Sequence, residues 1–252
     1  MSSVTVRNPH SVMAILESRP KDIMDIRVPA KAGSSPAWER VEAVARKAGL
    51  KVTVGGGASK EDRGRINAEG GREGGGSAQV REREGITAEE IFKGAADRAK
   101  GKGLWLALDC LQDPHNVGAI FRAAGFFGVQ GIIITHERSA PLSNVAYDVA
   151  SGGIEHVPFA IQPNLQHAFE VAKENGLWIL GTSEHSNDSY TKIERDRPWL
   201  LVLGNEEKGM RRLTEESCDV LCGIPPMGKG VTSLNVSVAA GILISRLTQP
   251  SK

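Results

Sequence analysis

Short apolar runs that alternate with helical segments are the feature that most limits how this chain can fold. Between residues 104 and 247, strands are predicted at residues 105–108, 131–135, 178–181, 200–204 and 220–224. Helices are predicted at residues 116–127, 143–151, 165–175 and 235–248. This alternation is typical of an α/β domain whose mostly parallel sheet is covered by helices on both faces. Because ligands bind such sheets beyond the carboxyl ends of the strands, we expect a site in those loops.

The remainder of the chain divides into two further parts. Residues 1–54 alternate helix and strand signals and are predicted to form a small α/β domain. Residues 55–85 are rich in Gly, Arg and Glu, and they bury too little apolar surface to offset the entropy of ordering. We therefore predict a linker over residues 55–100 and a main domain over residues 101–252. The string GGGASK in the linker could cradle a phosphate, but it lacks Walker spacing, which favours a flexible tether.

Charge and cysteine content narrow the class of protein. The formal net charge is +1, so any affinity for nucleic acid must come from local basic patches. No apolar run reaches about 18 residues, and no basic stretch precedes an apolar one at the N-terminus, so we expect neither a membrane span nor a secretory signal. Cys218 and Cys222 have a spacing that could chelate a metal on a helix, but they flank an apparent strand start. With Cys110 they suit a reducing cytoplasm, and we expect no bound metal.

The first of three motifs at strand ends is LDCLQDPHNVGAIFR, residues 108–122. It leaves a strand, passes through a proline-containing turn and enters a helix. Asn116, near the start of that helix, could simply cap it. Arg122 stands six residues later among apolar neighbours, which favours a directed role over a solvated one.

The second motif is LVLGNEEKGMR, residues 201–211. Gly204 and Gly209 permit tight turns and a close approach of the backbone to a ligand. Glu206 and Glu207 could instead be an acidic turn that favours the start of a helix.

The third motif is IPPMGKGVTSLNVSVAAG, residues 224–241. A strand runs into a Pro/Gly loop and then into a helix rich in small residues, which allow close packing. Ser233 and Asn235 could be helix caps or polar residues of a site.

Together and in this order, the strings DPHNVGAIFRAA, LVLGNEEKGMRR and IPPMGKGVTSLNVSVAAG resemble the signature motifs of the SpoU/TrmH family of the SPOUT class. The resemblance covers about residues 104–247 and is most like the rRNA guanosine-2′-O-methyltransferase members. It implies a C-terminal trefoil knot, a homodimer, and S-adenosylmethionine as the cofactor. It further implies cofactor contacts at Gly204, Ile224 and Leu234. The catalytic residues that it implies are Asn116, Arg122, Glu206, Ser233 and Asn235.

The first stretch resembles, more loosely, the small RNA-binding domain that precedes the catalytic domain in many rRNA members, through NPHSVMAILESRP and KAGLKVTV. This implies methylation of a ribose 2′-hydroxyl in large-subunit rRNA. The alternatives are a tRNA substrate and a silent RNA-binding homologue, whereas an NAD enzyme of the Rossmann type is disfavoured because no G-x-G-x-x-G follows the first strand. The loop PPMGKGVTS is one residue longer than the family form.

Overall fold

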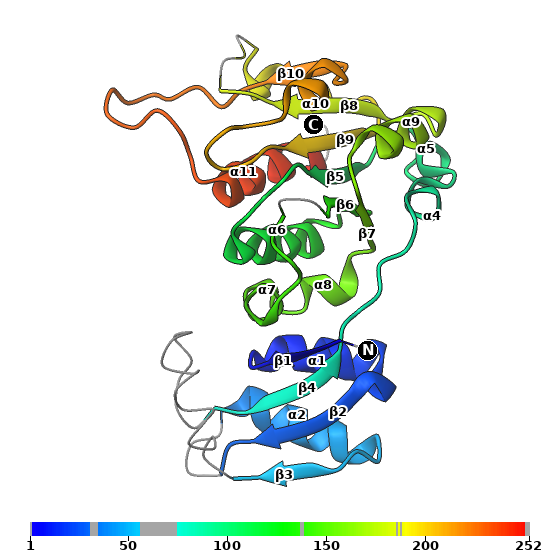
Figure 1. The fold of residues 1–252 in the computed structure, drawn as a ribbon, viewed down its shortest axis with the longest axis vertical. Helices are drawn as coiled ribbons and strands as arrows, with labels where there is room; N and C mark the ends of the chain where they lie inside the picture. The colour runs from blue at the N-terminus through cyan, green and yellow to red at the C-terminus, as the bar shows by residue number, and fades with distance from the viewer. Residues whose placement is uncertain are drawn as a thin grey trace.

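A six-stranded parallel sheet forms the centre of the main domain. The structure, a computed structural model, describes residues 2–30, 35–55, 75–136, 139–184, 186 and 188–249. The strand order is β10-β8-β9-β5-β6-β7, and every neighbouring pair is parallel. The strands are β5 (Leu104–Leu108), β6 (Ile132–Thr135), β7 (Phe159–Gln162), β8 (Trp178–Thr182), β9 (Trp199–Leu203) and β10 (Val220–Cys222). The predicted α/β class with a parallel sheet is confirmed (Figure 1).

Helices cover both faces of this sheet because its central strands are apolar on both sides. Leu104, Leu106 and Leu108 of β5 pack into one core cluster, and Trp105 and Ala107 pack into the other. The first cluster includes residues of α6 (Pro114–Phe127), α7 (Asn144–Ala150), α8 (Gly153–His156) and α11 (Val236–Thr248). The second includes residues of α4 (Ala88–Phe92), α5 (Ala95–Arg98) and α9 (Gln166–Glu174). The short helices α10 (Arg212–Glu216) and η3 (Tyr190–Lys192) complete the domain.

The N-terminal unit is a four-stranded mixed sheet with the strand order β1-β4-β2-β3. Its strands are β1 (Ser3–Val6), β2 (Ile23–Val28), β3 (Val52–Val54) and β4 (Ser77–Arg81), and its helices are α1 (Pro9–Ser18), η1 (Pro20–Asp22) and α2 (Pro36–Lys47). β4 runs antiparallel to both β1 and β2, whereas β2 and β3 are parallel.

The linker predicted over residues 55–100 differs from the structure in its described part. Residues 56–74 lie outside the described residues. Residues 77–81 form β4, where Ala78 and Val80 are fully buried in the core of the N-terminal unit. Residues 88–92 form α4 and residues 95–98 form α5, and Ile91 and Phe92 pack on the main sheet. The polar, Gly-rich composition concealed these apolar residues, which fill a period-2 pattern in β4 and one face of α4.

Polar contacts join the N-terminal unit to α7 and α8, which lie above β1 and α1 in Figure 1. Asp148 of α7 accepts hydrogen bonds from the backbone N–H groups of Arg7 and Asn8 at 2.6 and 2.8 Å. Arg19, after α1, pairs with the buried carboxylate of Glu155 at 2.8 Å. Among the described residues, no helix is long and apolar enough to cross a membrane.

Candidate active site

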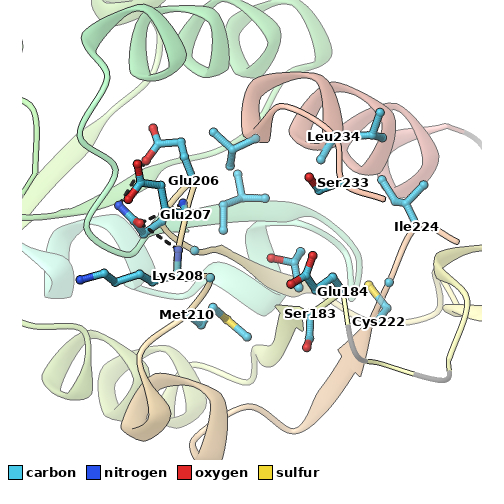
Figure 2. A pocket seen from close by; sticks show the side chains of 18 of the residues that line it. Ser183, Glu184, Glu206, Glu207, Lys208, Met210, Cys222, Ile224, Ser233 and Leu234 are labelled. Carbon is cyan, nitrogen blue, oxygen red and sulfur yellow. Dashed lines mark hydrogen bonds between the residues drawn. The ribbon is translucent and has the colours of Figure 1, made fainter. Parts of the chain in front are cut away.

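A cavity of about 720 Å³ opens at the carboxyl ends of β8, β9 and β10. Its wall comes from the segments that follow these three strands and from the loop that leads into α11 (Figure 2). Proteins with α/β sheets bind ligands in the chain segments that follow the carboxyl ends of their parallel strands. The predicted cofactor residues Gly204, Ile224 and Leu234 all line this cavity.

Position 204 requires glycine because the backbone of Gly209 and Met210 passes close to it. A Cβ atom at Gly204 would lie 2.3 Å from the backbone nitrogen of Met210, so any side chain there would force the loop apart. The loop between these residues is closed by paired backbone hydrogen bonds of 3.0 Å between Asn205 and Gly209.

The turn after β5 places Asn116 inside the site. The cap of α6 is Asp113, whose side chain accepts a hydrogen bond from His115 N–H at 2.8 Å. The reading of Asn116 as a helix cap is therefore wrong, because the proline at the first helical position and Asp113 before it fix the start earlier. Asn116 is only 6% exposed, and its amide is directed to other side chains.

One residue from each motif enters a continuous polar network. Asn235 Nδ2 donates to Asn116 Oδ1 at 3.0 Å, and Asn116 Nδ2 donates to Glu206 Oε1 at 3.0 Å. Asn235 also caps α11, since its Oδ1 accepts from Ser237 N–H at 2.9 Å. The cap reading of Asn235 is thus confirmed, and the same side chain also contacts Asn116.

The electrostatics of Glu206 suit an anion that is fixed in place. Burial raises the pKa of this carboxyl, but hydrogen bonds from the Asn116 side chain and from backbone N–H groups, including those of Gln112 and Asp113, outweigh burial and lower its pKa below the ordinary value. Glu206 is therefore ionised at neutral pH and can hold these donors together.

Arg122 and Ser233 do not join that network. Ser233 lines the cavity and is labelled in Figure 2. Arg122 is exposed on α6, and within the described ranges its guanidinium has no hydrogen-bond or ion-pair partner. The exposed guanidinium of Arg122 is therefore available to bind a group that does not belong to this chain.

The sequence did not single out the segment after β8. Thr182, Ser183 and Glu184 line the cavity opposite the second motif, together with Cys222 at the end of β10. Burial raises the pKa of Cys222 to about 12, so its thiol stays neutral and is no nucleophile. The available signal was positional, since β8 is an apolar strand beside β9 and its carboxyl end must open on the same edge.

Comparisons with known proteins agree with this geometry. A sequence model of the SpoU rRNA Methylase family matches residues 103–245. The chain is 35% identical to the 23S rRNA (guanosine-2′-O-)-methyltransferase RlmB of Pseudomonas aeruginosa over 93% of this chain and 92% of that protein. It is 41% identical to the putative TrmH family tRNA/rRNA methyltransferase YacO of Bacillus subtilis, where the match spans 66% of each protein.

A solved structure shares the fold across almost the whole chain. The SpoU methyltransferase AviRb from Streptomyces viridochromogenes, in complex with AdoMet, superposes with a TM-score of 0.75 at 18% identity, over 98% of this chain and 89% of that one. The family match covers more than half of the 252 residues, and the chain therefore belongs to the SpoU rRNA methylase family.

Proposed function

We propose that this chain transfers a methyl group from S-adenosylmethionine to a ribose 2′-hydroxyl in RNA, with large-subunit ribosomal RNA as the substrate. The network of Asn116, Glu206 and Asn235 carries the proposal, because it joins the three motifs beside the strand-end cavity. The name of the P. aeruginosa relative, a 23S rRNA (guanosine-2′-O-)-methyltransferase, supports ribosomal RNA as the substrate.

The cavity has a size and lining that fit this cofactor. Its volume of about 720 Å³ lies inside the range of roughly 300–1,000 Å³ that is usual for small-molecule sites. Ile224 and Leu234 offer apolar surface to an adenine, and the backbone at Gly204 allows close approach. The carboxylates of Glu184 and Glu207 offer acceptors to ribose hydroxyls and to an ammonium group. The cofactor supplies a methyl group on a positively charged sulfur.

The motif residues divide between charge stabilisation and orientation. Arg122 cannot be the base, because a guanidinium stays protonated in proteins, so it stabilises the negative charge that develops on the ribose oxygen. The proton leaves to an RNA phosphate or to water. Asn116, Ser233 and Asn235 orient the ribose and the arginine, while Glu206 fixes the loop that holds the cofactor.

The assembly that we propose is a homodimer whose C-terminal part forms a trefoil knot. Two exposed apolar side chains support a dimer interface on this side of the main domain. Phe126 on α6 is 83% exposed, and Val238 on α11 is 51% exposed. These two helices pack on each other, so a second copy seated there could cover both side chains. We place the protein in the cytoplasm, where ribosomal RNA is its partner and the free thiols of Cys110, Cys218 and Cys222 stay reduced.

Labelled S-adenosylmethionine and RNA from cells that lack the gene test the proposal. The purified protein is incubated with ribosomal and transfer RNA in parallel, and label is mapped by cleavage that is blocked by ribose methylation. Label at one 2′-oxygen of large-subunit rRNA is the expected result. Label confined to tRNA would overturn the substrate but keep the chemistry, and the absence of label from both pools would overturn the activity.

A further inference from the structure

A buried ion pair fastens the second motif to the end of β5. The carboxylate of Asp109 is fully buried. Its Oδ1 accepts from Arg211 Nε at 2.8 Å and lies 2.7 Å from Arg211 Nη2, while its Oδ2 accepts from the backbone N–H of Arg211 at 3.0 Å. The Cys110 thiol lies 3.6 Å from the same carboxylate.

The other end of the loop is tied to the same place. Asn205 Nδ2 donates to the carbonyl oxygen of Cys110 at 2.9 Å, and Asp109 N–H donates to the carbonyl of Leu203 at 2.8 Å. The segment of residues 204–211 therefore starts and ends on the two residues that follow β5. Between these ties it supplies Glu206 to the polar network and Met210 to the cavity wall.

The backbone at Cys110 is bent to make this attachment. Cys110 has φ +60°, a left-handed conformation that costs a non-glycine residue energy and persists where the surroundings impose it. Its N–H is held by Thr135 Oγ1 at 2.9 Å. A buried carboxylate is also costly unless it is paired and hydrogen-bonded. The strained backbone of Cys110 and the buried carboxylate of Asp109 are therefore adjacent in the chain at the base of the site.

We propose that Asp109 and Arg211 are positioning residues that set the shape of the cofactor cavity by holding the 204–211 loop. This inference rests on the proposed function, namely that the cavity binds S-adenosylmethionine. The pair acts through the backbone of Gly204 to Met210, because neither Asp109 nor Arg211 lines the cavity. Loosening the pair is expected to weaken cofactor binding more than RNA binding.

The neighbouring arginine provides a matched control. Arg212 forms an exposed pair with Glu216 at 2.7 Å within α10 and does not line the cavity. The test compares Arg211→Met, Arg211→Lys and Asp109→Asn with Arg212→Met. For each variant, titration calorimetry gives the Kd of S-adenosylhomocysteine, thermal unfolding gives Tm, and methyl-transfer assays give separate KM values for S-adenosylmethionine and RNA.

Arg211→Met and Asp109→Asn are expected to raise the Kd and the cofactor KM by about 10- to 100-fold, as for a displacement of about 1 Å in a site. Arg211→Lys should recover part of the loss, and the RNA KM should stay near the wild-type value. Arg212→Met should remain within about twofold, as for an exposed pair.

A pair that serves general stability alone would lower Tm while leaving the Kd unchanged well below Tm, and that result would overturn the inference. Wild-type protein that fails to bind S-adenosylhomocysteine would instead overturn the proposed function together with it. Should Asp109→Asn or Arg211→Met not fold, Arg211→Lys still decides the question, because lysine keeps a cation beside the buried Asp109 carboxylate but lacks the planar, two-point contact of the guanidinium.

Discussion

At the scale of single residues, the amide of Asn116 is the group on which the site depends. Its oxygen accepts from Asn235 and its nitrogen donates to Glu206, both at 3.0 Å. No other side chain of this length and shape presents a donor and an acceptor on one carbon. An aspartate could accept from Asn235, but its second oxygen would face the ionised Glu206 carboxylate. The asparagine therefore joins the third motif to the second without placing two like charges together.

Arg122 is expected to matter for turnover and not for stability. Because Arg122→Ala removes an exposed side chain that has no hydrogen-bond or ion-pair partner in the described part of the chain, the free energy of unfolding should change by less than about 0.5 kcal/mol. The Kd of S-adenosylhomocysteine should also be unchanged, while kcat falls by about 100- to 1,000-fold through loss of oxyanion stabilisation. Calorimetry and a methyl-transfer assay measure the two quantities. An affinity that fell as far as kcat would contradict the role.

The lowered pKa of Glu206 predicts a loss of stability in acid. The folded-state pKa lies below the unfolded value of about 4.3, so the carboxylate stabilises the protein above that pH and loses the effect as pH falls through the folded pKa. Glu206→Gln should therefore be less stable than wild type by a constant amount between about pH 5 and 8, and the difference should shrink below about pH 4. Urea unfolding at each pH measures the difference. A difference that grew on acidification would have the wrong sign.

At the scale of elements, the sequence predicted what local apolar pattern determines. β5, β6 and β9 lie within one residue of their predicted bounds, because each is a buried apolar run in a parallel sheet. β1, β4 and β7 were not predicted. In β4 only Ala78 and Val80 are apolar, and they follow a long Gly-rich segment. Their partners β1 and β2 are distant in sequence, so the pairing that makes a strand of these residues cannot be seen locally.

The same limit applies to the site. The motifs indicated Asn116, Glu206 and Asn235, and the structure brings them together. The loop is attached by Asp109 and Arg211, which lie 102 residues apart in the sequence, and no spacing pattern indicates that they meet. Glu184 was missed because a lone glutamate after a strand has no pattern of its own.

Two neighbouring substitutions test whether β4 is part of the N-terminal unit. Val80→Asp places a charge in a fully buried position and should unfold that unit, because an unpaired buried charge costs several kcal/mol. Gln79→Lys, at the exposed neighbouring position of the same strand and opposite Asp25 of β2, is the charged control and should have little effect. Limited proteolysis of the N-terminal unit and the Kd of S-adenosylhomocysteine are measured together. If Val80→Asp is cleaved no faster than wild type, β4 does not stabilise the unit.

At the scale of the whole molecule, the N-terminal unit and the main domain share one core cluster. Polar contacts of the N-terminal unit with α7 and α8 surround it, and we call this boundary the seam. Val12 and Ile15 of α1 belong to the same apolar cluster as Tyr147 of α7. Around it, Ser11 Oγ donates to the Tyr147 carbonyl at 2.6 Å, and the Arg83 guanidinium donates to the Val157 carbonyl at 2.9 Å. Such satisfied, buried polar contacts specify one orientation of the units, which a flexible tether would not. We therefore expect the distance from the N-terminal unit to the cavity to stay constant.

The pair of Arg19 and Glu155 gives the sharpest test of that orientation. The Glu155 side chain is 1% exposed, so Arg19→Ala leaves a buried carboxylate without its cation, at a cost of about 3–5 kcal/mol. We expect the seam to open, with a larger radius of gyration by X-ray scattering and a raised KM for RNA. The Kd of S-adenosylhomocysteine should stay constant, because the cavity is formed by the main domain. Arg46→Ala, which breaks the exposed pair with Glu42 in α2, should change neither quantity. If Arg19→Ala keeps the wild-type radius and RNA KM, the seam does not fix the units and the substrate must be positioned by the main domain alone.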